Sequence, residues 1–219
     1  MKSISAHFNR LNTQQFNTIW WGVAVLFVAA GIVAMTAPAE ATLGNGIRTV
    51  YVHVGLTWAG TAVFLLTAIL GLLVMFTSSR YLHDWMRPAG WVATAFYAAG
   101  VGMSMIASKV NWGAVFLQEP RMAAAINTLG IAVLIQIGAS WFPWLRLRGF
   151  LNVVFIVLLY WVTYLAPLVL HPKDAASSSA SSSGIRVTFL VLFGLFLAAA
   201  LMTIWQLRHR MMNVKKIKQ

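Results

Sequence analysis

The chain has 219 residues, of which 60% are hydrophobic and only 9% are charged, whereas a soluble domain usually carries about 25% charged residues. This much apolar surface cannot be buried inside one small globule, which excludes an ordinary soluble domain and favours a membrane protein. The absence of cysteine excludes disulfides, thiolate metal sites and a cysteine nucleophile.

The formal net charge is +12, and such a charge on a soluble protein would favour binding to nucleic acid. Here the basic residues stand in short segments between apolar stretches. We therefore interpret them as cytoplasmic flanking residues that contact membrane lipid headgroups, and we expect no nucleic-acid partner.

Six apolar stretches follow one another, each about long enough to cross a hydrocarbon core of ~30 Å as a helix at ~1.5 Å per residue. Backbone polar groups in lipid must be satisfied within the segment, so these stretches are helices. The predicted fold is all-α: a polytopic membrane protein whose six transmembrane helices form a single domain over residues 1–219. The predicted spans are Thr18–Thr36, Thr49–Phe76, Ala89–Ala107, Met122–Phe142, Phe150–Leu170 and Ile185–Leu207.

The distribution of lysine and arginine predicts the orientation. With six spans both termini share one side, and that side holds eleven of the sixteen basic residues. Because positive residues collect on the cytoplasmic side, we expect cytoplasmic termini and a multi-pass protein of the bacterial cytoplasmic (inner) membrane. The five basic residues of the outer side are Arg48, Lys109, Arg121, Lys173 and Arg186.

Two of the five histidines lie at the outer boundary of predicted spans. His53 is about one turn into the second span, and His171 ends the fifth. An ionisable residue within a span is costly and indicates function, and neutral imidazole is a common axial ligand of haem iron. The two histidines could hold one haem between them; each could equally be an interfacial histidine that bonds a neighbour. The others, His7, His83 and His209, are predicted to be solvated.

Arginines accompany these histidines on the outer side. Arg48 precedes His53 by five residues, and Arg121 opens the fourth span. Haem carries two propionates, and arginine binds carboxylates through a planar fork. These positions therefore suit a haem whose propionates point outward, although snorkelling at the interface explains any one of them.

The outer segment 109–121 is too apolar for a free aqueous loop. Trp112 and Phe116 would lie on the membrane surface or cover a ligand. Pro120 suits the first turn of the fourth helix, and Glu119 beside it favours the positive end of that helix. The segment is predicted to be either an amphipathic shelf over a porphyrin edge or a plain interfacial helix.

Three short segments resemble the CcmC/CcsA family of haem-handling membrane proteins of cytochrome c biogenesis. The stretch Arg48–Trp58 looks like that family's segment around its first haem-ligating histidine. Trp112-Gly113 through Glu119-Pro120-Arg121 resembles the tryptophan-rich WWD signature, although its central tryptophans are replaced here. Leu170-His171-Pro172 stands where the family has its second histidine ligand.

The resemblance implies a protein, not an enzyme, that binds haem b at the outer membrane face and presents or transfers it during cytochrome c assembly, as part of a haem exporter or chaperone. It also implies an ABC-type transporter and a periplasmic haem chaperone as partners. By this resemblance, His53 and His171 would be axial ligands of the haem iron, and Arg48 and Arg121 would contact the propionates. Trp112 and Phe116 would pack on the macrocycle. Tyr51 and Trp58 would line the pocket or brace the helices.

Two other classes of function stay open. A bis-histidine cytochrome b-type subunit that transfers electrons within a membrane complex would need the same two ligands. A haem-free membrane scaffold would need neither. Energy-driven transport by this chain alone is disfavoured, because the sequence holds no GxxxxGK[ST] motif for ATP.

Overall fold

The computed structural model describes residues 2–167 and 182–217, with side chains over 18–167 and 182–212. These residues form helices and contain no strand beyond an isolated bridge between Glu40 and Gly44. Each helix contains a segment long and apolar enough to cross a membrane, which confirms the predicted all-α fold with six helices of sufficient length. The helices are α1 (Lys2–Thr36), α2 (Ile47–Thr77), α3 (Arg80–Trp112), α4 (Pro120–Trp141), α5 (Leu145–Leu165) and α6 (Ser183–Ile217).

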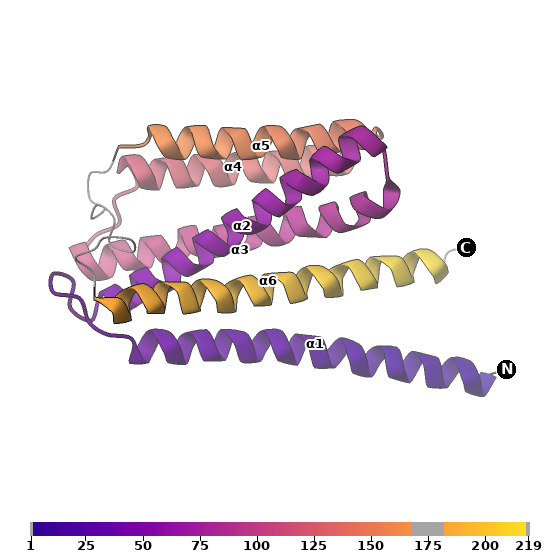
Figure 1. Cartoon of the computed structure of the whole chain (residues 1–219), viewed down its shortest axis with the longest axis horizontal. Helices are drawn as coiled ribbons and strands as arrows, with labels where there is room; N and C mark the ends of the chain where they lie inside the picture. The colour runs from indigo at the N-terminus through magenta and orange to yellow at the C-terminus, as the bar shows by residue number, and fades with distance from the viewer. Residues whose placement is uncertain (1, 168–181, 218–219) are drawn as a thin grey trace.

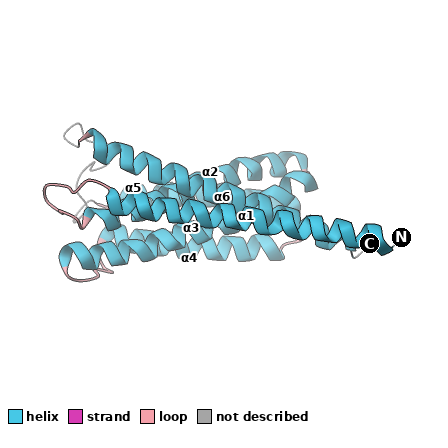
Figure 2. Cartoon of the chain, turned by 90° about the horizontal axis from the view of Figure 1, so that it is seen from below, coloured by secondary structure: helices cyan, strands magenta, loops and turns pink. Residues whose placement is uncertain are grey.

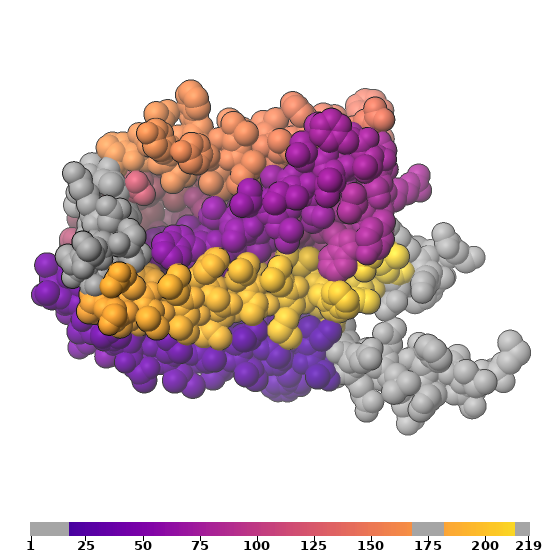
Figure 3. Space-filling model, viewed as in Figure 1, coloured from indigo at the N-terminus to yellow at the C-terminus, as the bar shows by residue number. Residues whose placement is uncertain are grey.

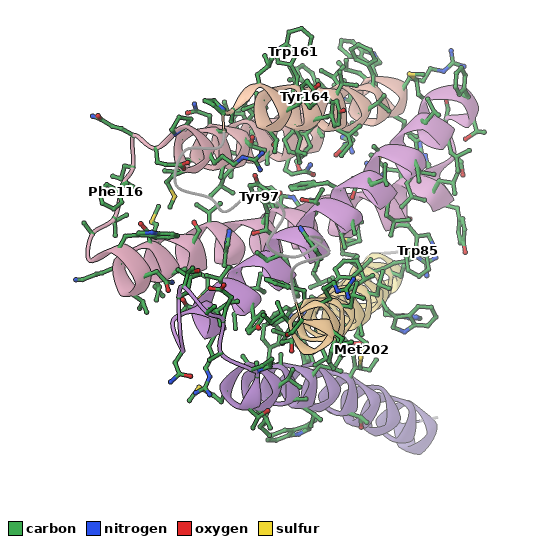
Figure 4. The ribbon with its side chains drawn as sticks, turned by 60° about the vertical axis from the view of Figure 1, so that its left-hand side comes forward. Trp85, Tyr97, Phe116, Trp161, Tyr164 and Met202 are labelled. Atoms are coloured by element: carbon green, nitrogen blue, oxygen red, sulfur yellow. The ribbon has the colours of Figure 1, made fainter. Side chains whose placement is uncertain are left out.

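Helix α2 is the centre of the bundle and contacts α1, α3, α5 and α6. Helices α4 and α5 pair on one side of it, and α1 and α6 pair on the other (Figure 1). On the face shown in Figure 3, α6 lies between α1 and α2. In Figure 4 Met202 of α6 lies beside α1; a Cβ at Gly22 of α1 would lie 2.6 Å from its methyl group. The peripheral α4 contacts only α3 and α5 within the described chain.

The bundle has two distinct ends (Figure 1). One end, the terminal end, holds both chain termini together with the short connections 78–79 and 142–144. The opposite end, the loop end, holds the connections 37–46 and 113–119. His53, Arg48 and Arg121 lie near the loop end, as the predicted helix order requires.

Helix α3 begins nine residues before the predicted start at Ala89. The Ser79 side chain accepts a hydrogen bond of 3.4 Å from the backbone N–H of Leu82 and so caps the helix. Pro88 then lies inside the helix, where the missing N–H leaves only one carbonyl without its helical partner. The predicted span began at Ala89, directly after Pro88, whereas the capped helix continues through this proline.

Helix α5 ends at Leu165, five residues before the predicted boundary. Pro167 follows at the second position, and a proline disfavours helical backbone in the residue before it. Ala166 accordingly adopts φ −74° and ψ 116°, an extended conformation. The apolar residues after Pro167 led the prediction to extend the span.

Helices α2 and α3 approach closely because glycines line their contact. A Cβ at Gly60 would lie 2.7 Å from the backbone nitrogen of Tyr97, and a Cβ at Gly100 would collide with Thr57. Figure 4 shows Tyr97 inside the bundle. This contact also places the side chain of His53 directly against the backbone of α3.

Candidate functional site

His53 is held in a defined orientation by the neighbouring helix. It is half-buried, and its Nδ1 lies 2.9 Å from the carbonyl oxygen of Gly100. A carbonyl only accepts, so Nδ1 carries a proton in this contact, and when the ring is neutral Nε2 is the unprotonated nitrogen. Histidines that bind metals through one nitrogen usually donate the other N–H to a carbonyl or carboxylate in this way.

Thr57 stands one turn further along α2, and its hydroxyl also lies near Nδ1 of His53. Its hydroxyl donates to the carbonyl of His53 at 2.9 Å and lies 3.4 Å from Nδ1. Gly100 can approach this pair because it has no side chain to collide with Thr57. The orientation of the imidazole thus depends on the glycine contact between α2 and α3.

The loop end brings the start of α2 next to the end of α3. The Asn111 amide donates to the carbonyl of Gly46 at 3.3 Å and to the hydroxyl of Thr49 at 3.4 Å. Arg48 and Trp112 therefore belong to adjacent helix ends. Trp112 is 37% exposed and the following Gly113 ends α3 with φ 79°.

Arg121 is the second residue of α4, and the start of α4 packs on α3 near the residues that contact His53. Glu119 caps α4, accepting from the backbone N–H of Met122 at 2.7 Å, and Pro120 occupies the first turn, which confirms the predicted helix start. The Ser104 hydroxyl lies 3.4 Å from the sulfur of Met122. Ser104 follows Gly100 by one turn of α3. The start of α4, with Arg121, therefore contacts α3 roughly 6 Å closer to the loop end than His53 does.

Arg48 and Arg121 share an unusual feature. The Nε atom of each is buried and has no hydrogen-bond partner in the described part of the chain. A buried N–H without an acceptor is costly and rare. Both side chains therefore have a donor to offer to an anion that the described residues do not supply.

The balance of charge at the loop end favours an anion. The described residues there include four cations, Arg48, Lys109, Arg121 and Arg186, and two carboxylates, Glu40 and Glu119, which leaves an excess of two positive charges. Both carboxylates already accept backbone N–H groups of their own segments. A ligand with two carboxylates would restore neutrality.

The segment 113–119 is not helical, so the prediction of a plain interfacial helix is wrong. It is a short irregular loop because Gly113 ends α3 and Pro120 begins α4. Phe116 is 40% exposed and lies at the loop end of the molecule, away from the core (Figure 4). Ser108 donates to the carbonyl of Ala114 at 2.8 Å and holds the loop against α3.

Tyr51 and Trp58 lie on a different face of α2 from His53. Tyr51 is fully buried, its hydroxyl donates to the carbonyl of Pro38 at 3.1 Å, and its ring meets Phe189 of α6 edge-on at 4.8 Å. Trp58 lies 6.1 Å from the Phe189 ring. Both residues brace α2 against α6, one of the two roles predicted for them.

His171, the second predicted ligand, lies outside the described residues. Helix α5, which precedes it, ends at the loop end of the bundle, where His53 also lies. No group of three or more His, Cys, Asp or Glu side chains that could hold a metal ion occurs within the described residues. A haem iron needs only one or two side chains, because the porphyrin supplies its other ligands.

At the terminal end the structure corrects one prediction and adds a site that the sequence did not indicate. His83 is buried rather than solvated, and its Nε2 lies 3.1 Å from a guanidinium nitrogen of Arg148. Nearby, the Gln136 amide donates to Asn152 at 2.9 Å, and both residues are buried. These partners come from α3, α4 and α5, so no local sequence pattern could have paired them.

Comparison with models of known protein families found no match, and comparison with curated proteins found no significant relative. The likeness to haem-handling proteins therefore rests on the residues described above.

Proposed function

We propose that this chain is a multi-pass membrane protein with cytoplasmic termini that binds haem b at the loop end of its bundle. It presents or transfers that haem on the outer face of the membrane during cytochrome c assembly. The observation that carries this proposal is the contact between His53 Nδ1 and the carbonyl of Gly100. It selects the neutral tautomer whose Nε2 has the lone pair that an iron ligand needs.

The arginines support the same ligand. Arg48 and Arg121 each have a buried Nε–H without an acceptor among residues 18–167 and 182–212, and the described residues of the loop end carry an excess of positive charge. Haem propionates are carboxylates that could accept from both. Trp112 and Phe116 are exposed beside them and offer flat surfaces to the macrocycle.

The proposed second ligand is His171, which comes after α5 in the sequence; α5 itself ends at the same end of the bundle as His53. When bound, haem would supply an iron that binds imidazole reversibly, and His53 and His171 would hold it until an acceptor takes it. The chain's own residues would orient the imidazole, bind the propionates and cover one porphyrin edge. Partners in this proposal are an ABC-type transporter, which supplies energy, and a periplasmic haem chaperone, which accepts the haem.

The test is a haem spectrum of the purified protein in detergent beside single variants. Wild type should show a Soret band, and His53→Ala and His171→Ala should each reduce the haem bound per chain several-fold. The matched control is His209→Ala, because His209 is exposed at the terminal end, where its ring lies 4.7 Å from that of Trp205. Haem content that is unchanged in both ligand variants would reject the assignment.

A second assay separates haem transfer from electron transfer. If the haem leaves the chain for a soluble acceptor protein, the proposed role in assembly is supported. Rapid reduction by a quinol, with the haem retained, would instead favour a cytochrome b-type subunit. The specific observation behind this alternative is the loop 113–119, which carries one aromatic ring, Phe116, instead of a tryptophan platform.

A further inference from the structure

The outward face of α4 carries a polar side chain, Asn127, next to a glycine. Its buried residues Met122, Ala124, Thr128, Ala132, Gln136 and Ala139 form one stripe that packs on α3 and α5. At about 100° per residue, Asn127 lies on the opposite side of the helix, together with Gly130 and Leu134, and all three are exposed. Helix α4 also lies along one edge of the molecule (Figure 2).

Asn127 is an exposed amide inside a predicted membrane span. It stands seven residues after Pro120, which places it roughly 10 Å into the helix. Its side chain makes no hydrogen bond to the described part of the chain. Of the other helix amides whose burial is described, Gln136, Asn152 and Gln206 are buried and Asn111 is half-buried and hydrogen-bonded. An amide facing hydrocarbon without a partner is costly.

Gly130 makes room next to this amide. Nothing lies within 4 Å of the position that a Cβ at Gly130 would occupy, so this glycine serves no contact within the chain. In membranes, small residues let two helices approach closely, and polar side chains bond across the contact. Asn127 and Gly130, about one turn apart, together present both features on the same outward face.

We propose that a second copy of this chain packs on this face, α4 against α4, about a two-fold axis along the membrane normal. An amide is both donor and acceptor, so two copies of Asn127 satisfy each other. Because the two-fold axis runs along the membrane normal, it places the two Asn127 side chains at the same depth in the membrane. The inference rests on the membrane insertion proposed above, but it is independent of haem binding.

Disulfide cross-linking tests this dimer with little background, because the chain has no cysteine. Gly130→Cys in native membrane vesicles should form, on oxidation, a product of twice the 24.1 kDa chain mass. The control is Val157→Cys on α5, which is 59% exposed at a similar depth and should stay monomeric. Asn127→Leu, added to Gly130→Cys, should lower the cross-linked fraction about threefold or more, the factor expected for one interhelical hydrogen bond in lipid.

Three outcomes would overturn the dimer: no cross-linked product from Gly130→Cys, a product of another mass, or a yield that Asn127→Leu leaves unchanged. A product of another mass would identify a helix of a different protein as the occupant. The same series in a His53→Ala background should cross-link equally well, so a failure to bind haem is distinguished from a failure to dimerise. Release of the chain from vesicles by alkaline carbonate would reject both the insertion and the dimer.

Discussion

The residues around His53 divide between two faces of α2. Tyr51 and Trp58 are seven residues apart, two helical turns, and both pack on α6. His53 points instead at Gly100 of α3. The spacing in the sequence was enough to predict that Tyr51 and Trp58 share a face. It could not predict which neighbouring helix each face meets, because that depends on contacts between residues far apart in the chain.

Glu40 offers a test of the loop that covers Tyr51. Hydrogen bonds lower the pKa of its carboxyl, chiefly from the Thr42 hydroxyl and then from the backbone N–H of Leu43, and outweigh a slight effect of burial. A lowered pKa stabilises the folded loop above the unfolded value of about 4.3, and this contribution is lost as the pH falls through the folded pKa. We expect hydrogen-exchange protection of the Thr42 and Leu43 amides to fall a few-fold at low pH.

The variant Glu40→Gln provides the control for this prediction. It should show the reduced protection already at neutral pH and little further change on acidification, because the amide does not titrate there. Protection in wild type that is independent of pH between neutrality and pH ~3, below the unfolded value, would contradict the role assigned to this carboxylate.

At the scale of the elements, the contact between α2 and α3 should be sensitive to added bulk. A Cβ at Gly60 would lie 2.7 Å from the backbone nitrogen of Tyr97 and 3.0 Å from its Cα, and neither backbone atom can move without moving the helix. We expect Gly60→Ala to destabilise the protein by about 1–3 kcal/mol, the usual cost of overpacking. The measurement is a thermal unfolding midpoint in detergent.

Gly102→Ala is the matched control on α3. No atom lies within 4 Å of its added Cβ, and alanine favours helix over glycine by up to about 1 kcal/mol. Its midpoint should stay the same or rise. If Gly60→Ala and Gly102→Ala shift the midpoint equally, close helix packing at Gly60 is not what stabilises the bundle.

The helix ends show how far local sequence determines the elements. The start of α4 was predictable because Glu119 and Pro120 act within one turn. The start of α3 and the end of α5 were not predicted, although Ser79 and Pro167 are local features too. At these two ends the prediction followed the hydrophobic pattern alone. A helix continues past polar residues wherever a cap and contacts with the bundle satisfy its backbone hydrogen-bonding groups.

At the scale of the whole molecule, polar contacts join the two helical hairpins α2–α3 and α4–α5 at the terminal end. Arg146 donates to Ser78 at 2.9 Å, and Arg148 contacts His83 at 3.1 Å. Within the second hairpin, Gln136 of α4 donates to Asn152 of α5 at 2.9 Å. The sequence showed these residues as scattered and sparse. Their pairing follows only from the fold, because each partner comes from a different connection or helix.

The buried pair Gln136 and Asn152 predicts a non-additive effect on stability. Asn152→Leu leaves the Gln136 amide without its acceptor, and Gln136→Met leaves the Asn152 carbonyl oxygen without its donor. Each single variant should cost about 1–3 kcal/mol, the usual penalty for an unsatisfied buried polar group. The double variant removes both groups, so it should cost clearly less than the sum of the singles. Unfolding of the four proteins in mixed detergent gives the coupling energy directly, and strictly additive costs would mean that the pair does not act as one buried unit joining α4 to α5.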